Sequence, residues 1–565
     1  MGKNKNILSA HSNQWKRKFL LSFLGSIGLF FSVLGQDPNW EKGELESVEI
    51  EIDIERKITL PQVNRNFEKI PPRASEPITP PISYSFLPLS FQTVPVKPLI
   101  KPLKVKQETP PNVWGGYLKG GYGNFVTPYL EGYINSVRDK SKLVGAHAWL
   151  KNSGKGPVDA QNSASGNYGL SVFGKTFSQV FSLGGDVSYE NVYTHFYGYP
   201  EGLEVMRDTI RHAFDKFRLG MTFGNAKNSN FQYELGGNFN YLSDNFSARE
   251  TEVVGNLGLK YNLDEQQAVQ LKVKYFLINR KDELVAALPR NLLDGHIFYT
   301  FKPTDESRLT LGARVVYEND SIDNKDLHFY PDVSAAYTIS PSVELVGSFS
   351  GGIDKVSLHS LIQDNLWLAP NIPIYHTNRK IETTASLRAK LGAKTLFQTG
   401  ISLGSFENMV FFVNDSIDQA VFQTTYDRGT TKRSNLFISL SLAQARKGSL
   451  LLRGDAFNYS TNSLQEPWHR PSYRVSLSGS YNIVEKILVS MNFVTQGGMK
   501  AYDYTSKKVI SLDEALDLSF KVEYIFSDSF SLFADFRNVL GNAYPIYLNY
   551  PVRGFQGLGG LTWSF

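Results

Sequence analysis

The chain contains 565 residues, with a formal charge of +5, a mean hydropathy of −0.25 and no cysteine. The lack of cysteine excludes disulfides, thiolate metal sites, cysteine nucleophiles and a lipid anchor on an N-terminal cysteine. Residues 1–35 carry five basic and no acidic residues, so the rest of the chain has 59 − 5 = 54 basic and 54 acidic residues. That balance leaves no basic domain, and we expect no nucleic-acid partner.

Residues 1–35 have the pattern of a cleaved signal peptide. A basic region that ends at Lys18 is followed by an apolar stretch over 19–34. Positions 33–35 carry aliphatic and small residues where a signal peptidase reads, so we predict that the mature chain begins at Gln36. The alternative is an uncleaved anchor, but the apolar stretch is shorter than the roughly 20 residues that a spanning helix needs.

Residues 36–112 differ in composition from everything that follows. Twelve of the 26 prolines lie between Pro61 and Pro111, and proline lacks the N–H group that a β-ladder needs. We therefore predict an extended, polyproline-like segment in the periplasm. Within it, residues 47–55 alternate apolar and mainly acidic side chains, which fits either a strand that pairs with a partner's sheet edge or a solvated acidic linker.

From 113 to 565 the sequence predicts repeated strands separated by polar turns. The alternation of apolar and polar residues is least ambiguous in four segments, 144–151, 181–190, 269–277 and 516–526. The longer segments approach the 9–11 residues that a tilted strand needs to cross a bilayer. The ordinary mean hydropathy does not contradict this, because the strands of a transmembrane barrel alternate lipid-facing and lumen-facing residues.

We count 22 or 23 strand candidates in these 453 residues, about 21 residues for each strand and its turn. Single-chain bacterial barrels have an even number of strands, so we predict 22 antiparallel strands with both ends on one side. Soluble propellers and β-helices would show internal repeats, and we find none. Only lipid can cover the apolar face of so many two-faced strands. An aromatic content of 13% agrees with interfacial girdles.

The last eight residues, 558–565, resemble the signal with which bacterial outer-membrane β-barrels end. Gly560 stands third in this segment, and Trp563 and Phe565 stand sixth and eighth. Alternation places Leu561 and both aromatic residues on one face of a strand. The resemblance implies that this is the closing strand of the barrel, and that Gly560, Trp563 and Phe565 are read by the barrel assembly machinery.

The final hairpin resembles the end of TonB-dependent receptors, in which a strand runs into an Asp-x-x-Asn-Leu turn, a tyrosine and an arginine. The residues that stand near these places are Asp535, Asn538, Leu540, Tyr544 and Arg553. A second similar segment contains Asn365, Leu368 and Pro370, and the stretch 60–72 looks like outer-membrane proteins of the Bacteroidetes type. The resemblance implies a barrel in the outer membrane of a Gram-negative cell, with both termini in the periplasm and a part in uptake or transport.

The chain departs from that family in its N-terminal part. TonB-dependent receptors fill the lumen with a globular plug, whereas the 77 residues of 36–112 are too proline-rich for that domain. Either a periplasmic partner closes the lumen, or part of 36–112 folds back into it. The alternative function is a docking or scaffold component of an outer-membrane or secretion complex, which would hold partners through 36–112.

No pattern in the sequence predicts an enzyme, a metal or a cofactor. The nine histidines show no zinc-binding spacing, and His195, His296 and His376 are interpreted as interfacial or loop residues. The paired glycines at 115–116 and 120–121 alternate with tyrosines in a strand and do not form a nucleotide loop. The charges predicted to face the lumen, such as Lys272 and Glu523, mix both signs and favour no particular ion.

Overall fold

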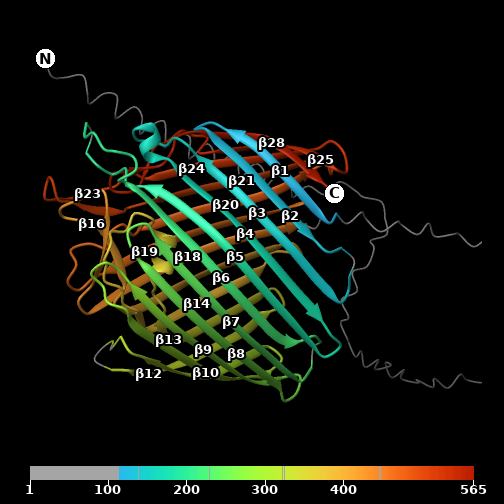
Figure 1. Ribbon diagram of the computed structural model, residues 1–565. Coiled ribbons are helices and arrows are strands. Elements are labelled where there is room, and N and C mark those ends of the chain that lie inside the picture. The colour runs from blue at the N-terminus through green and yellow to red at the C-terminus, as the bar shows by residue number, and fades with distance from the viewer. Residues whose placement is uncertain are drawn as a thin grey trace, which may run out of the picture. The chain divides into compact units, whose positions relative to one another are not determined.

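The computed structural model describes residues 114–137, 139–200, 202–227, 229–320, 322, 325–444 and 447–565. These residues form one closed antiparallel β-barrel of 22 strands (Figure 1). The barrel strands are β1 (Gly116–Gly123), β2 (Thr127–Asn135), β3 (Lys142–Ser153), β4 (Ser165–Phe177), β5 (Phe181–His195), β6 (Arg211–Asn225), β7 (Phe231–Asp244), β8 (Arg249–Asn262), β9 (Gln267–Lys281), β10 (Leu288–Thr304), β11 (Ser307–Glu318), β12 (Leu327–Ser340), β13 (Val343–Asp354), β14 (Thr377–Lys390), β15 (Thr395–Glu407), β18 (Thr430–Gln444), β19 (Gly448–Ser460), β20 (Tyr473–Ile483), β21 (Ile487–Gly497), β24 (Ala515–Ile525), β25 (Phe530–Arg537) and β28 (Gln556–Ser564).

The first and last strands close the ring. Tyr117 of β1 lies opposite Tyr133 of β2 on one side and Ser564 of β28 on the other. Every other barrel strand pairs with its two neighbours in the sequence order given above. A closed ring leaves no unpaired strand edge, which is the condition for crossing a lipid bilayer with strands. The predicted fold class and strand number are therefore confirmed.

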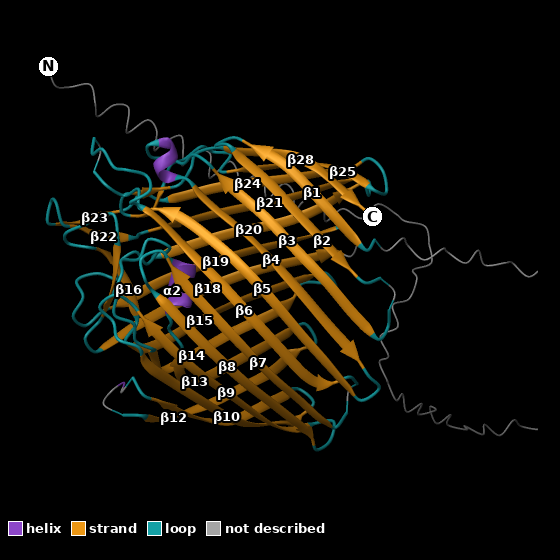
Figure 2. Cartoon of the chain, viewed as in Figure 1, coloured by secondary structure: helices purple, strands orange, loops and turns teal. Residues whose placement is uncertain are grey.

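The two rims of the barrel differ in the length of their connections. At one rim, here called the short-turn rim, the connections run from two residues (305–306) to six (136–141), and both β1 and β28 have their free ends there. The opposite rim, the long-loop rim, carries connections such as 355–376 and 408–429. Figure 2 shows these loops gathered at the end that carries β16 and β23.

The remaining elements belong to the long loops. They are η1 (Ala160–Ser163), α2 (Leu358–Asp364), β16 (Val410–Asn414), β17 (Phe422–Tyr426), β22 (Lys500–Asp503), β23 (Lys508–Ser511), β26 (Pro545–Tyr547) and β27 (Tyr550–Pro551). Neither of these helices is long and apolar enough to cross a membrane.

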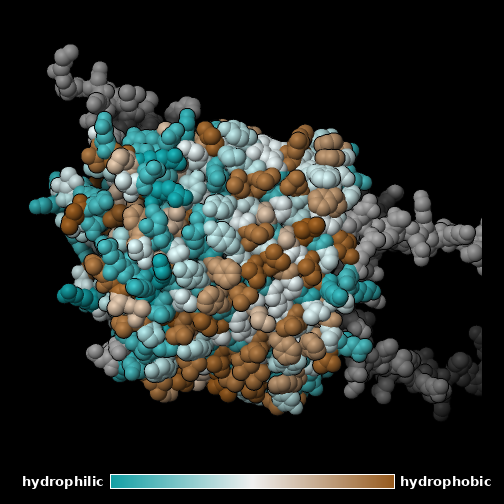
Figure 3. Space-filling model, viewed as in Figure 1, coloured by the Kyte–Doolittle hydropathy of each residue, from teal (hydrophilic) through white to brown (hydrophobic). Residues whose placement is uncertain are grey.

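The outer surface of the barrel is apolar at its middle and aromatic towards both rims. Six outward aliphatic side chains on different strands are 42% to 60% exposed: Leu118, Leu170, Leu219, Ile297, Ile401 and Leu436. Exposed aromatic residues near the short-turn rim are Phe181, Phe231, Tyr261, Tyr337, Tyr481, Tyr524, Phe530, Trp563 and Phe565. Those near the long-loop rim are Tyr122, Tyr168, Tyr189, Phe217, Tyr275, Tyr317, Phe329 and Phe536. Figure 3 shows apolar groups over the strands and hydrophilic groups over the loops.

The separation of the two aromatic rings matches a membrane. Phe181 and Tyr189 of β5 are 189 − 181 = 8 residues apart, as are Phe329 and Tyr337 of β12. Eight residues of strand extend about 26 Å. A strand tilt of about 40° reduces this to about 20 Å along the barrel axis, close to the apolar band of about 25 Å in outer-membrane barrels.

Two predictions fall outside the described residues. The signal peptide (1–35) and the proline-rich segment (36–112) both precede Trp114, the first residue that the structure describes. The predicted start of the barrel at 113 is close to the first strand residue, Gly116.

Candidate functional site

The lumen wall consists of paired charges. Lys216 of β6 lies 2.8 Å from Glu190 of β5, and Arg314 of β11 lies 2.7 Å from Asp294 of β10. Further pairs along the wall are Lys119–Glu523, Arg218–Asp186, Arg433–Glu382, Arg453–Asp455 and Arg537–Asp535. Alternation along each strand turns these residues inward and the aliphatic residues outward. Most of the wall therefore carries both signs of charge, as the sequence predicted.

Loops from different sides of the long-loop rim meet in one layer across the mouth of the barrel. We call this the loop layer; it consists of 196–200, 355–376, 408–429 and 538–555. One cluster of buried side chains joins these segments, with Tyr197, Leu361, Leu368, Phe412, Phe422, Tyr547 and Tyr550 among its members. Strands β5 and β15, which carry two of the segments, lie ten strands apart around the ring, so their loops share a core only by spanning the mouth.

Aromatic rings and their polar groups hold the loop layer together. The Tyr550 ring lies 4.6 Å from that of Tyr197 and 4.3 Å from that of Trp367, measured between centroids. The Tyr550 hydroxyl donates to the carbonyl of Ala420. Trp367 Nε1 donates to the carbonyl of His195 over 3.1 Å. Because each buried polar group of these rings has a partner, the layer gains apolar contact without leaving donors unsatisfied.

Helix α2 is fixed to the barrel by a buried carboxylate. Glu250 of β8 accepts hydrogen bonds from the backbone N–H groups of Leu358 (2.7 Å) and His359 (2.8 Å), the first two residues of α2. Burial raises the pKa of Glu250, and these two hydrogen bonds oppose that shift. Lys355 anchors the same loop through Glu252, over 2.6 Å.

Two buried histidines of the loops are held in their neutral form. His376 Nδ1 accepts from Arg290 Nη2 (2.9 Å) and from the Val356 N–H (3.1 Å), so this nitrogen cannot carry a proton. Burial lowers the pKa of His376 to about 4, and the charge of Arg290 adds to the shift. His469 Nδ1 donates to the Phe412 carbonyl, and burial likewise lowers the pKa of His469 to about 4.

Arg290 also pairs with a carboxylate next to His376. Its Nη2 lies 2.5 Å from Asp320 Oδ2. Burial disfavours the charged form of Asp320, but the hydrogen bonds and charge of Arg290 outweigh that effect, so the pKa of this carboxyl is lowered. Asp320 lies in the β11–β12 connection, and Arg290 of β10 also contacts His376 of the loop layer. The pair therefore joins this connection to the loop layer.

The residues that carry the family resemblance serve as ties between loops and strands. Asn538 is buried, and its Nδ2 donates to the carbonyls of Asn542 (2.7 Å) and Arg553 (2.8 Å). Arg553 Nη2 in turn donates to Ser165 Oγ over 2.9 Å. In the other motif, Asn365 and Leu368 are buried in the loop layer directly after α2.

The predicted closing residues lie at the seam between β1 and β28. Trp563 and Phe565 face outward and are 46% and 43% exposed. Gly560 faces the lumen, where an added Cβ would lie 2.1 Å from the carbonyl oxygen of Gly120 and 2.6 Å from the Phe533 ring. Glycine is therefore required at 560 by the packing of the seam. Its reading by the assembly machinery remains a prediction.

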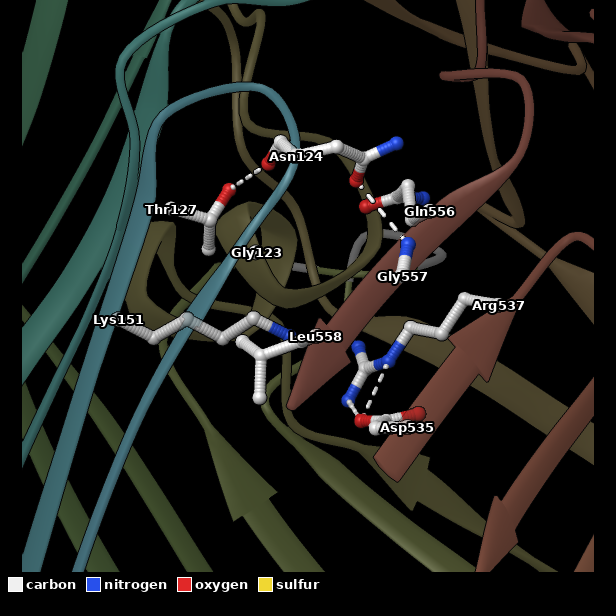
Figure 4. Close-up of a pocket in the computed structure, with 9 residues that line it drawn as sticks. All are labelled: Gly123, Asn124, Thr127, Lys151, Asp535, Arg537, Gln556, Gly557 and Leu558. Carbon is white, nitrogen blue, oxygen red and sulfur yellow. Dashed lines mark hydrogen bonds and ion pairs between the residues drawn. The ribbon is translucent and has the colours of Figure 1, made fainter. Parts of the chain in front are cut away.

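The seam also contains a small polar pocket near the long-loop rim (Figure 4). Asn124 joins its two sides, because its Oδ1 accepts from the Gly557 N–H (3.0 Å) and its Nδ2 donates to the Phe555 carbonyl (2.8 Å). The pocket volume is about 10 Å³, space for about one water molecule. This pocket lies at the junction of β1 and β28, and its volume is too small for an organic solute.

The three histidines singled out from the sequence occupy different places. His195 ends β5 and is buried, His376 precedes β14 in the loop layer, and His296 lies within β10, 3.0 Å from Asp332 of β12. The structure brings none of them together. Among the residues that the structure describes, no group of three or more His, Asp or Glu side chains is placed to hold a metal ion.

Sequence reasoning missed the loop layer. Two segments of the sequence do indicate it: 361–370 and 544–550 are rich in aromatic and aliphatic residues but lack strand alternation. An apolar run outside a strand in a barrel must be covered by other loops. The short helix α2 was also not predicted, although the Ser357 side chain accepts an N-cap hydrogen bond from the Ser360 N–H.

Comparison with known proteins gives a match of fold without a match of sequence. No protein-family model and no curated protein sequence matches the chain. Among solved structures it is similar to the siderophore receptor PirA from Acinetobacter baumannii, with a TM-score of 0.62 and 10% identity over 81% of each chain. The FrpB iron transporter from Neisseria meningitidis gives a TM-score of 0.64 and 9% identity over 80% of this chain and 82% of its own.

A third similar structure is the ferric-catecholate import receptor Fiu from E. coli K12, with a TM-score of 0.62 and 10% identity over 81% of this chain and 82% of that one. Identities this low establish the fold alone. The resemblance to receptors of this type, first seen in the final hairpin, is confirmed at the level of the 22-stranded barrel.

Proposed function

We propose that the protein is an outer-membrane barrel that takes part in the uptake of solutes, with the long-loop rim outside the cell and both termini in the periplasm. Outer-membrane barrels have short periplasmic turns and longer extracellular loops, and the two rims differ in that way here. The observation that carries the proposal is the loop layer, a packed closure across the outer mouth of a barrel whose wall is charged.

The similar structures bear names that refer to siderophore and iron import. Transport is the function that this fold supports best for the present chain. In this proposal residues 1–35 are a cleaved signal peptide, and 36–112 form a periplasmic segment that contacts a partner or regulates the lumen. Residues Gly560, Trp563 and Phe565 act in barrel assembly, and the outer surface between the aromatic rings contacts lipid. The proposal includes no enzymatic step.

The test measures ion conductance in planar bilayers for the mature chain, with and without residues 36–112. We expect low conductance from the native protein, because the loop layer spans the mouth. Tyr550→Ala removes a ring that contacts Tyr197, Trp367 and Phe422, so it should raise the frequency of open events severalfold. Tyr550→Phe retains those ring contacts and loses only the hydrogen bond to Ala420, so it serves as the matched control.

A barrel that stays closed to ions after Tyr550→Ala, both with and without 36–112, contradicts a role in transport. That result would favour the second candidate, a docking component of an outer-membrane complex, for which the loop layer would be a permanent closure. Co-purification from outer membranes then separates the two, since a docking component loses its partners when 36–112 is deleted.

A further inference from the structure

One part of the lumen wall departs from the balanced pairing of charges. A cavity of about 500 Å³ lies on the inner face of β4 to β9, beside the short-turn rim. Its walls carry Lys175, Lys227, Lys260 and Lys272 but only one carboxylate, Glu234. We call this cavity the lysine pocket. Four ammonium groups against one carboxylate give it an excess charge of 4 − 1 = +3.

These lysines also differ from the paired basic residues of the lumen wall, because they lack a carboxylate partner. Lys119, Lys216, Arg314 and Arg433 each lie within 4.0 Å of an acidic side chain. Within the described part of the chain, none of the four pocket lysines forms such a pair. Two of them rest on aromatic rings instead, with Lys175 Nζ 5.2 Å from the centroid of Phe177 and Lys272 Nζ 5.1 Å from that of Phe298.

Strand register explains the shape of the pocket. Gly258 of β8 lies directly between Glu234 of β7 and Lys272 of β9, and Lys260 lies between Gln232 and Gln270 in the next row. An added Cβ at Gly258 would have no atom closer than 3.9 Å, so the floor of the pocket is bare at this point. Lys260 and Lys272 are diagonal neighbours on adjacent strands, a spacing of roughly 7–8 Å, so they lie at one margin of the pocket. Lys175, four strands away on β4, forms the other.

We propose that the lysine pocket binds a small hydroxylated solute that carries an anionic group at each end. Lysine binds phosphate or carboxylate as a point charge. The two margins supply cations for the two ends, and Glu234 between them accepts hydrogen bonds from hydroxyl groups in the middle. A volume of about 500 Å³ falls within the range of small-molecule sites. The inference rests on the proposed transport function only for the biological role of the pocket, because a solute can bind there without passing through the barrel.

The test is calorimetric titration of the detergent-solubilised full mature chain with fructose 1,6-bisphosphate, with fructose as the neutral control ligand. The bisphosphate should bind saturably and more weakly as salt rises, and fructose should not bind. The double variant Lys260→Gln/Lys272→Gln should weaken binding about tenfold or more, because both cations of one margin are lost. Gly258→Trp, which fills the floor from a position with room for a side chain, should weaken it similarly.

The matched control is Lys507→Gln/Lys508→Gln, which removes the same charge from the β22–β23 hairpin at the other rim and should leave the affinity within about twofold. Equal binding of fructose, or an unchanged affinity in the Lys260/Lys272 variant, overturns the proposal. It is also overturned if the bisphosphate does not bind while a hexaglutamate peptide does, because the pocket would then dock an acidic polypeptide. If the Tyr550→Ala barrel stays closed to ions, with and without 36–112, while the bisphosphate still binds, transport is refuted and the binding proposal is not affected.

Discussion

Glycine at the barrel seam decides whether the first and last strands can approach. Phe533 of β25 lies over Gly560 and Gly121, and Lys119 Nζ lies 4.1 Å from the centroid of the same ring. The bare backbone of the two glycines leaves room for the ring against the lumen wall. Because the β1–β28 pairing is the last contact that closes the barrel, a side chain at 560 acts on closure more than on any single strand.

Gly560→Val is expected to lower the yield of folded barrel severalfold, since its Cβ would overlap the Gly120 carbonyl and overpacking of this kind costs about 1–3 kcal/mol. The yield is measured as the heat-sensitive, fast-migrating band in gel electrophoresis. Gly120→Val is the matched control, because Gly120 faces outward and an added Cβ there meets no atom within 4 Å. Equal yields from the two variants would contradict the role of Gly560 in the seam.

At the scale of elements, the loops are held by buried neutral groups whose protonation opposes the folded state. His469 Nδ1 donates to the Phe412 carbonyl and His469 Nε2 accepts from the Leu548 N–H, so both nitrogens are used. Protonation of Nε2 would remove that acceptor. His376 has the same constraint at Nδ1, which accepts from Arg290 and Val356. The loop layer is thus stable only while both rings stay uncharged.

We expect the loop layer to loosen as the pH falls from about 6.5 to about 4. The folded-state pKa of each histidine, about 4, lies below the ordinary value of 6.5, so the unfolded loops take up protons in this window and the folded loops do not. Each neutral histidine contributes up to about 3 kcal/mol to the stability of the folded loops. This contribution is complete above pH 6.5 and is lost as the pH falls towards 4. Because the pKa of Asp320 is lowered, the stabilising charge of this carboxylate is lost only below this pH window.

Hydrogen exchange at pH 7 and pH 4.5, corrected for the intrinsic rates, checks this expectation. Protection should fall in 355–376 and 408–429 but not in the barrel strands. His469→Gln retains a donor and an acceptor without a titrating ring, so it should reduce the pH dependence. Equal protection of the loops at both pH values would contradict the argument.

Around the whole barrel, the outer face of each strand is suited to lipid and the inner face to the aqueous lumen. The outer face carries aliphatic residues between aromatic rings, and the inner face carries paired charges. In a soluble protein such an outer surface would be an unusually large exposed apolar patch. The barrel is therefore stable only with lipid or detergent around it.

A matched pair of substitutions in β11 tests this division. Leu311 faces outward, is 45% exposed and lies opposite Val333, midway between Phe329 and Tyr337 of β12, whereas its neighbour Thr310 faces the lumen. Leu311→Lys should reduce the free energy of unfolding in lipid vesicles by about 2–4 kcal/mol, the cost of a lysine near the bilayer midplane. Thr310→Lys should change it by less than about 1 kcal/mol, because the lumen is polar. Equal effects of the two variants would show that lipid does not cover the outer face.

The barrel can be predicted from the amino-acid sequence alone. Alternation with a period of two recurs in segments such as 269–277 and 516–526, and each lies within the strand it predicted or runs one residue past it. The closing strand was predicted from the local pattern of the last eight residues. The strand number was predicted from a count of 22 or 23 candidates and the even number that bacterial barrels have. The paired glycines at 120–121 were likewise correctly placed in a strand.

What lies inside and across the barrel depends on contacts between distant segments and could not be predicted from the sequence. The sequence predicted a lumen of mixed charge, yet Lys175 and Lys260 face one pocket because the register of five strands, β4 to β8, brings them there. In the same way, Tyr197 and Tyr550 are more than 350 residues apart in sequence and are in ring contact. Period-two alternation fixes which face a residue takes, whereas its neighbours on that face depend on strand register and ring closure, which no local pattern encodes.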